Sequence, residues 1–378
     1  EGGLFADAVN PSGYIRNLGL VNTTIIDAHS TYSLFIGTLV GRTDTPITNV
    51  YSENLNITVN SAASTYVGGL VGGSIYSTAN KGNITKSYAT GTISATVNAA
   101  SKETQVGGLV GNVGANVSLS YANVNVYASA PFDALASTAS YAGGLLGYIA
   151  GGTQITNNYA LGTVNNPDPS GFAYGGGFAG STQSSQNIQG NYSTGVVANM
   201  GTSLHGGFIG SYGGGTISGN YWDTETSGTT NSVNNTTQAG VNAVTTANMK
   251  AAASVSGLGT ITSAVSSTLP TTIWFMIEGA TRPMLVMEYA TTIKNAQQLQ
   301  LMNAATSASY TLANNINLNT SMNNLSEVWG TDVGVSGAGW APIGNTTTRF
   351  SGVFNGNNHY ISNLYINSTG TLGLFGAT

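Results

Sequence analysis

The stretch that decides the fold is Gly68-Gly69-Leu70-Val71-Gly72, because close relatives of it recur along the chain. From Leu4 to Phe208 the apolar residue at the third position of this motif returns at intervals of 30 to 39 residues. Self-similarity at such a period is the sequence signature of a repeat architecture. The other copies of the motif are centred on Leu4, Leu39, Leu109, Leu145, Phe178, Phe208 and Leu374.

A second motif, Ile or Val followed four residues later by Tyr, keeps step with the first. The chain has 19 tyrosines in 378 residues, so seven placements in one register exceed what composition would give. The first copy departs from the pattern, because Ile15 is followed by Gly19. The seven pairs are Ile47/Tyr51, Ile84/Tyr88, Val117/Tyr121, Ile155/Tyr159, Ile188/Tyr192, Ile217/Tyr221 and Ile361/Tyr365.

Both motifs indicate short strands, since they are β-branched and aromatic and are bounded by Gly, Asn, Ser and Thr. A unit this small cannot bury its apolar face alone, but stacked copies can bury it against one another. We therefore predict an all-β parallel β-helix, or β-solenoid, with coils of three short strands. Variable stretches at 59–66, 97–105, 128–140 and 165–174 are expected to be loops on its flanks.

Stacked coils lie about 4.8 Å apart, so equivalent side chains should form ladders. Lys86 has the same parity as Ile84 and Tyr88, which indicates a bend in the chain at that point. One buried stack is expected to contain Leu39, Leu70, Leu109, Leu145, Phe178 and Phe208. A second should contain Ile47, Ile84, Val117, Ile155, Ile188 and Ile217. A core ladder of aromatic rings should contain Tyr51, Tyr88, Tyr121, Tyr159, Tyr192 and Tyr221.

The periodicity weakens after Tyr221, and we divide the chain into three parts on this basis. Residues 1–223 are the solenoid, and residues 224–290 an irregular segment that closes the array. This segment should contain a short helix at 246–253 and a pair of buried strands within 273–289. Residues 291–378 should contain a helix at 295–305, a strand at 310–318 and the start of a new array near Trp340.

Composition excludes several classes of protein. Cys is absent, so no disulfide framework can form. Only 6% of residues are charged while 41% are hydrophobic, which argues against charge-driven disorder. Nine Lys and Arg residues are scattered along a chain of net charge −5, which argues against nucleic acid as a partner. No apolar run approaches the roughly 18 residues of a membrane span.

The residues resemble bacterial surface and secreted proteins that carry the GLUG motif, named for its Gly-Leu-apolar-Gly core. The resemblance extends to residues 220–228 (NYWDTETSG), 296–303 (AQQLQLMN), 340–344 (WAPIG) and 350–356 (FSGVFNG). It implies an extracellular or cell-surface location, a bacterial source and a parallel β-helix, often within large adhesin-like proteins. Some proteases also carry the motif as an accessory region, but the family has no general catalytic set, and His-Glu-x-x-His is absent here.

Candidate chemical residues are few. His29, His205 and His359 lie in different repeats with no acid at ligand spacing. Asp223 and Glu225 form the only close acidic pair in a distinctive motif, and a glycosidase needs two carboxylates in one groove. A turn and cap at the end of the array explains this pair better, with calcium binding as a minor alternative. We therefore assign no catalytic residue, cofactor or metal ligand.

Two functional classes remain. The first is a non-enzymatic structural protein that forms a fibre, stalk or adhesin by stacking of solenoid units, with itself as partner and surface glycans as further candidates. The second is a polysaccharide-binding or polysaccharide-cleaving β-helix. Four arginines, at positions 16, 42, 282 and 349, do not cluster as a carbohydrate enzyme would require, so the first class is favoured.

The two ends of the chain match each other in sequence. Gly373-Leu374-Phe375 repeats Gly3-Leu4-Phe5, 370 residues apart. This match predicts that the chain is one full period of a longer fibre, made by tandem units of one protein or by head-to-tail stacking of subunits. With roughly 9–11 coils at about 4.8 Å each, the axial repeat should be on the order of 45–55 Å.

Overall fold

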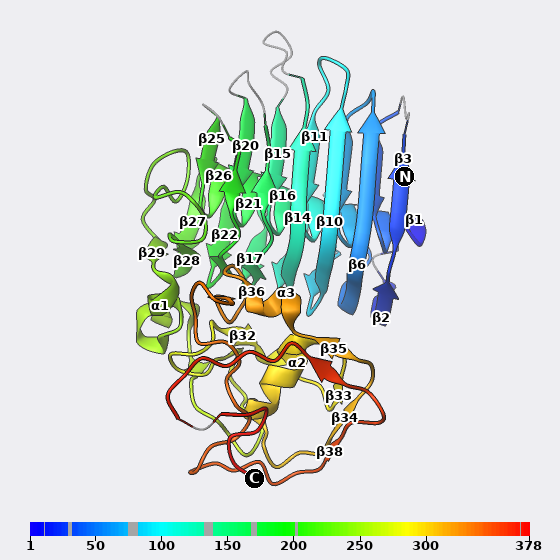
Figure 1. Ribbon diagram of the computed structural model, residues 1–378. Helices are drawn as coiled ribbons and strands as arrows, with labels where there is room; N and C mark the ends of the chain where they lie inside the picture. The colour runs from blue at the N-terminus through cyan, green and yellow to red at the C-terminus, as the bar shows by residue number, and fades with distance from the viewer. Residues whose placement is uncertain are drawn as a thin grey trace. The chain divides into compact units, whose positions relative to one another are not determined.

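The computed structural model divides the chain into two compact units, Glu1–Ala243 and Val244–Thr378 (Figure 1). No helix in the described part of the chain is long and apolar enough to cross a membrane. The structure describes residues 1–10, 12–28, 32–74, 82–131, 139–167, 172–200, 203–370 and 372–378.

The first unit is a parallel β-solenoid, which confirms the predicted fold class. Its coils follow one another side by side in chain order (Figure 1), and together they form three sheets, with the first coil contributing strands to two of them. Sheet A contains β4 (Leu34–Gly37), β7 (Thr65–Gly68), β11 (Thr104–Gly107), β15 (Ser140–Gly143), β20 (Ala173–Gly176) and β25 (Leu204–Gly206). Sheet B contains β1 (Phe5–Ala8), β5 (Val40–Thr43), β8 (Val71–Ser74), β12 (Val110–Val113), β16 (Leu146–Ile149), β21 (Ala179–Thr182) and β26 (Ile209–Tyr212).

Sheet C is formed by the remaining part of each coil. Its strands are β2 (Ile15–Val21), β3 (Thr24–Asp27), β6 (Ile47–Ser61), β9 (Ile84–Thr85), β10 (Tyr88–Val97), β13 (Val117–Ser118), β14 (Tyr121–Ser129), β17 (Gln154–Thr156), β18 (Tyr159–Ala160), β19 (Val164–Asn165), β22 (Gln186–Gln189), β23 (Tyr192–Ser193), β24 (Val197–Ala198), β27 (Gly215–Ser218), β28 (Asn220–Asp223) and β29 (Val241–Val244). The flanking loops are shorter than predicted, because β6 runs to Ser61, β7 begins at Thr65 and β14 runs to Ser129. Parts of the predicted loops at 128–140 and 165–174 lie outside the described residues.

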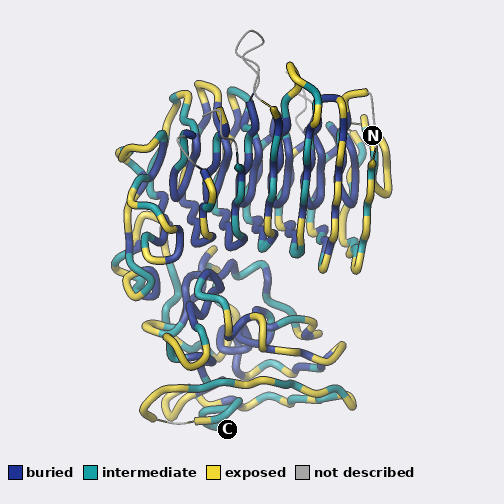
Figure 2. The backbone as a smooth tube through the Cα atoms, turned by 45° about the horizontal axis from the view of Figure 1, so that its top comes forward, coloured by how far each residue is buried: buried dark blue, intermediate teal, exposed yellow. Residues whose placement is uncertain are grey.

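The interior of the solenoid consists of stacked apolar side chains from equivalent positions. Middle coils are mostly buried, whereas the coil nearest the N-terminus is largely exposed (Figure 2). Ile47, Ile84, Val117, Ile155 and Ile188 are fully buried, and Ile217 is half-buried in the last coil. The exposed fraction is 0% for Leu39, Leu70, Leu109, Leu145, Phe178 and Phe208.

Glycines of the repeated motif stand where sheets A and B approach each other too closely for a side chain. A Cβ atom on Gly68 would lie 2.0 Å from the carbonyl oxygen of Val71, and one on Gly72 would lie 2.3 Å from the nitrogen of Ile36. A Cβ on Gly69 would point across the interior, 2.7 Å from the Cβ of Ala89. Real Cβ atoms do not come this close to other atoms, so these positions require glycine.

The four-residue spacing from Ile to Tyr reflects a corner of the coil. The residue midway between them has a positive φ in every coil, which turns the chain sharply and confirms the bend expected at Lys86 (φ 52°). Asparagine and glycine adopt this conformation with least strain, yet Leu119 (φ 51°) also occupies it. The corner residues are Asn17, Asn49, Lys86, Leu119, Asn157, Gly190 and Gly219.

This corner changes which side of the strand the tyrosines occupy. Rings of successive coils stack, with centroids 5.0 Å apart for Tyr51–Tyr88 and 4.7 Å for Tyr88–Tyr121. However, Ala89 and Ala122, one residue further on, belong to the apolar core cluster, and the tyrosines do not. Because neighbouring residues of a strand point to opposite sides, the tyrosine rings lie on the side of the strand away from this cluster. They are nevertheless buried there, with exposed fractions of 2% for Tyr121 and 0% for Tyr159 and Tyr192.

A ladder of polar side chains lines the inside of the same corner, one residue before each tyrosine. The backbone N–H of Ser87 donates to Oγ of Ser120 (3.1 Å), and that of Ser120 donates to Oδ1 of Asn158 (3.0 Å). Asn158 donates in the same way to Asn191 (2.9 Å), and Asn191 to Asn220 (3.0 Å). Each side chain therefore satisfies a buried backbone group of the preceding coil.

The second unit contains shorter elements. The predicted buried strand pair is β31 (Trp274–Phe275) with β32 (Met284–Leu285), antiparallel and fully buried. The two predicted helices are each a short α-helix followed by a 3₁₀ turn. Its helices and 3₁₀ turns are α1 (Thr246–Met249), η1 (Ala252–Leu258), η2 (Val286–Glu288), α2 (Ala296–Gln300), η3 (Leu301–Ala304) and α3 (Asn319–Met322).

Parallel stacking returns in the same unit. β33 (Thr292–Ile293), β34 (Tyr310–Leu312) and β38 (Phe354–Asn355) form a parallel sheet, and β35 (Ile316–Asn317) pairs with β39 (Ile361–Ser362). Asn363 has a φ of 59°, which repeats the corner of the first unit. The other strands are β30 (Ile261–Thr262), β36 (Asn323–Asn324) and β37 (Thr331–Asp332).

Candidate functional site

Sheets A and B enclose a groove on the outside of the solenoid. The close approach of their strands at the glycines turns the outward side chains of the two sheets toward each other. Asn112 of sheet B accordingly donates to Oε1 of Gln105 of sheet A (2.7 Å). The groove has a volume of about 440 Å³ and is lined by Phe35, Arg42, Tyr66, Ser74, Glu103, Gln105, Asn112, Tyr141 and Tyr148.

Aromatic rings form a ladder along the sheet A wall of this groove. Phe35 stacks on Tyr66 with ring centroids 4.5 Å apart, and Tyr141 stacks on Tyr174 at 5.2 Å. Strand register places Gln105 between Tyr66 and Tyr141, so the ladder is interrupted there by a side chain without a ring. From sheet B, Tyr148 meets the edge of Tyr141 at 5.4 Å.

Glu103 is the carboxylate that lines the groove. Its Oε1 accepts a hydrogen bond from the hydroxyl of Tyr66 (2.7 Å). Burial, followed by this hydrogen bond, raises the pKa of Tyr66. Burial, with a smaller contribution from the charge of Glu103, also raises the pKa values of Tyr141 and Tyr148.

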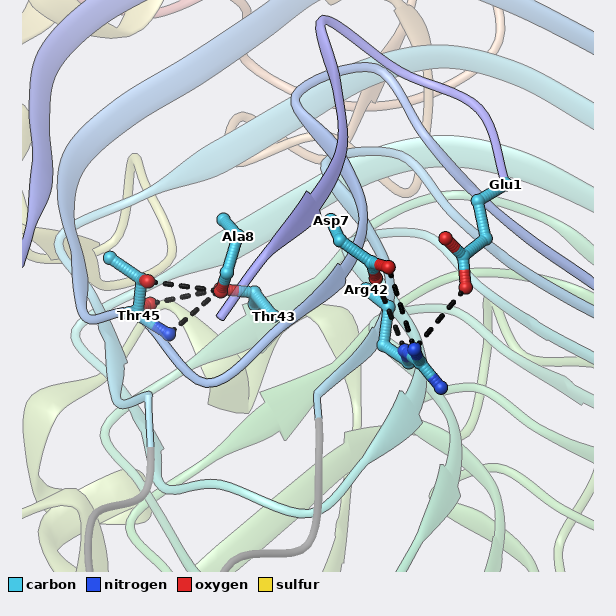
Figure 3. A network of polar contacts seen from close by, with 6 residues as sticks. All are labelled: Glu1, Asp7, Ala8, Arg42, Thr43 and Thr45. Carbon is cyan, nitrogen blue, oxygen red and sulfur yellow. Dashed lines mark hydrogen bonds and ion pairs between the residues drawn. The ribbon is translucent and has the colours of Figure 1, made fainter. Parts of the chain in front are cut away.

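Arg42 lies toward the N-terminal coil and is neutralised by two acids (Figure 3). Its Nε donates to Oδ1 of Asp7 (3.1 Å), and its guanidinium lies 3.5 Å from the carboxylate of Glu1. Partial burial acts to raise the pKa of Asp7, but the hydrogen bonds, chiefly with Arg42, outweigh it and lower that pKa. The guanidinium also lies 5.7 Å from the ring centroid of Phe35. Because Arg42 is paired with Asp7 and Glu1, this end of the groove carries little net charge.

The residues weighed earlier for catalysis or metal binding do not converge. Asp223 is fully buried and its Oδ1 accepts from the backbone N–H of Glu225 (3.0 Å), whereas Glu225 is exposed. This geometry is that of a turn. His205 contacts the carbonyl of Ser203 (3.0 Å), and His359 contacts Asn315 (3.3 Å). Among the described residues, which do not include His29, no group of three His, Asp or Glu could hold a metal ion.

Sequence reasoning missed the groove, although its signal is present. In the six strands of sheet A, the residue two positions before the first glycine of the motif is aromatic in four, Gln in one and Leu in one: Phe35, Tyr66, Gln105, Tyr141, Tyr174 and Leu204. The junction residues predicted at the two ends have matching conformations, with φ of 154° at Gly3 and 155° at Gly373. Leu4 and Phe5 are exposed in the first coil, whereas Phe375 packs on Phe350 with centroids 4.9 Å apart.

The family described as the GLUG motif matches residues 63–94, which span β7, β8, β9 and β10. The chain carries a GLUG motif. The described residues of the match contain a sheet A strand, the glycine corner, a sheet B strand and the Ile-to-Tyr corner. No curated protein and no solved structure matches the chain.

The raised tyrosine pKa values predict that alkali destabilises the GLUG solenoid. A tyrosine in the unfolded chain loses its proton near pH 10, while Tyr66 in the folded protein keeps it to higher pH. The contribution of the Tyr66 hydroxyl to the free energy of unfolding is therefore fully present below pH 10 and is lost as the pH rises above it. Urea unfolding at pH 9 and pH 11 should show a fall in the free energy of unfolding that is smaller in Tyr66→Phe. An equal fall in both proteins would contradict the assignment.

Proposed function

We propose that this chain is a non-enzymatic structural element of a bacterial cell surface or extracellular fibre, stalk or adhesin, built by stacking of solenoid units on one another. The observation that carries the proposal is the open edge of the first coil. Leu4 occupies the same coil position as the buried Leu39, since the register of β1 with β5 places Phe5 beside Val40, yet Leu4 is 55% exposed.

Backbone geometry supports stacking at this edge. Strands β1, β2 and β3 each pair with a following strand on one side only. Unpaired strand edges favour addition of another strand, and Leu4 and Phe5 offer the apolar surface that an added coil would cover. A contact of this kind joins two different surfaces, and where the rotation does not close into a ring it generates a filament.

A charge at the end of the leucine stack should abolish association. Sedimentation velocity of the 378-residue protein is expected to show concentration-dependent, head-to-tail oligomers, with rods visible by electron microscopy. Leu4→Glu should leave monomers, because the added coil would have to bury the carboxylate. Ile26→Glu is the matched control, since Ile26 lies in the same coil, is 72% exposed and pairs with the exposed Thr58. Monomers at every concentration, or oligomers that survive Leu4→Glu, would refute the proposal.

A second candidate function, binding of polysaccharide, is favoured by the aromatic groove. Faces and edges of aromatic rings bind the C–H surfaces of sugars, and amide and carboxylate groups bind their hydroxyls. Cleavage is not proposed, because a glycosidase requires two carboxylates about 5–10 Å apart and Glu103 is the one acid among the lining residues. Hydrolysis of a bound polysaccharide by the purified protein would overturn this part of the proposal.

A further inference from the structure

We propose that the interruption of the aromatic ladder at Gln105 is a slot for one pyranose ring of a neutral glycan. This inference rests on the second candidate function, binding of polysaccharide along the groove. Tyr66 and Tyr141 flank Gln105 in strand register, so each presents one ring face toward the gap. Their other faces stack on Phe35 and Tyr174 respectively, which fixes both rings in place.

The width of the gap favours a sugar over a flat ring. Tyr66 and Tyr141 are two coils apart, which corresponds to about 9.6 Å along the solenoid axis. A planar base inserted between two aromatic faces fills only about 7–8 Å, because each van der Waals contact takes roughly 3.5–4.0 Å. A pyranose chair is thicker than a planar ring, since its axial hydrogens project from both faces, and it fills the remaining space.

The side chain at the interruption, Gln105, is 4% exposed and lines the groove. Gln105 is shorter than tyrosine and is drawn toward sheet B by its hydrogen bond with Asn112. The amides of Gln105 and Asn112 therefore form a polar floor between the two rings. Hydroxyl groups of a sugar, which both donate and accept hydrogen bonds, match these amides and the carboxylate of Glu103.

Charge in the groove favours a neutral glycan. Among the lining residues Arg42 is the one cation, and it is paired with Asp7 and Glu1. An anionic sugar would thus meet Glu103 without a compensating positive charge.

Isothermal titration calorimetry of the full chain tests the proposal with cellohexaose, xylohexaose, mannohexaose and chitohexaose, and with adenosine as the planar probe. We expect at least one hexasaccharide to bind and adenosine not to bind. Tyr141→Ala should weaken binding of that hexasaccharide at least about tenfold, through loss of one stacking face and its burial. Tyr127→Ala is the matched control, because Tyr127 lies on sheet C and does not line the groove, and it should bind as the parent does.

Gln105→Tyr separates loss of binding from loss of folding. This variant fills the slot with a ring and makes the ladder continuous, so hexasaccharide binding should be lost while the melting temperature stays equal or rises. Binding that survives Gln105→Tyr would overturn the slot and leave groove binding in place. Absence of binding by all four hexasaccharides would overturn both the slot and polysaccharide binding in the groove. Adenosine binding that Gln105→Tyr abolishes would overturn the sugar slot and assign it to a planar ligand instead.

Discussion

Replacing Gly143 with alanine is expected to lower the free energy of unfolding of the solenoid by more than about 3 kcal/mol, a large share of a typical domain's stability. The added Cβ would lie 1.9 Å from the carbonyl oxygen of Leu146 and 2.6 Å from the nitrogen of Gly180. Both are backbone atoms in stacked strands. They cannot move away without breaking inter-coil hydrogen bonds, so the clash cannot be relieved by a side-chain rotation.

Gly2→Ala is the matched control for this substitution. A Cβ on Gly2 would meet its nearest neighbour, Cγ1 of Ile36, at 3.7 Å, which is an ordinary contact. Its free energy of unfolding should stay within about 0.5 kcal/mol of the parent's. Urea unfolding followed by circular dichroism measures both variants, and similar values for the two would show that sheets A and B are less closely packed at the corner than described.

The same glycines explain why the solenoid could be predicted from sequence. Where two sheets approach this closely, only glycine fits, so every coil has glycine at this position. The repeat period is therefore visible in the sequence alone. The leucine stack follows for a related reason, because each coil presents the same interior to the next. Leu70 and Leu109 were thus predictable as neighbours although 39 residues separate them.

The orientation of the tyrosine ladder could not be predicted in the same way. Alternation along a strand assigns residues to sides only while the backbone stays extended, and the corner breaks that alternation. Asn49 and Asn157 are residue types that commonly adopt positive φ, but Lys86 and Leu119 are not. The sequence therefore predicted a bend in one coil, at Lys86, but did not show that the same bend recurs in the other coils.

The groove was also beyond sequence reasoning, since it depends on the angle between two sheets. Tyr141 and Tyr148 lie on opposite walls only because the chain reverses direction sharply at Gly143 and Gly144. Read as isolated strands, the same residues are simply outward-facing aromatics. The two side chains converge because of the angle between the sheets at this corner. The residue pattern predicts the corner but does not predict its angle.

Loss of the polar ladder inside the second corner should be almost as damaging as the glycine clash. Oδ1 of Asn191 accepts from the backbone N–H and the side-chain amide of Asn158, both at 2.9 Å. Its Nδ2 donates to the carbonyl of Ile155 and to Oδ1 of Asn220, also at 2.9 Å. Asn191→Ala removes all four bonds and leaves the Asn158 N–H without its acceptor and the Ile155 carbonyl without this donor, whereas the Asn158 amide keeps its bond to the Val117 carbonyl and Oδ1 of Asn220 keeps the backbone N–H of residue 191. Since each unsatisfied group costs about 1–3 kcal/mol, we expect a loss of about 3–5 kcal/mol in the free energy of unfolding.

Asn191→Ser is the informative control, because serine already occupies this ladder position at Ser87 and Ser120. Oγ of Ser87 accepts from the backbone N–H of Val50 (3.2 Å), so a serine at 191 can still accept from the N–H of Asn158. The serine variant should lose about half as much stability as the alanine variant. Amide hydrogen exchange gives a local measurement: the Asn158 N–H should be protected in the parent and in Asn191→Ser, and should exchange fast in Asn191→Ala. Equal exchange in the two variants would show that packing of the asparagine, rather than its hydrogen bonds, holds the corner.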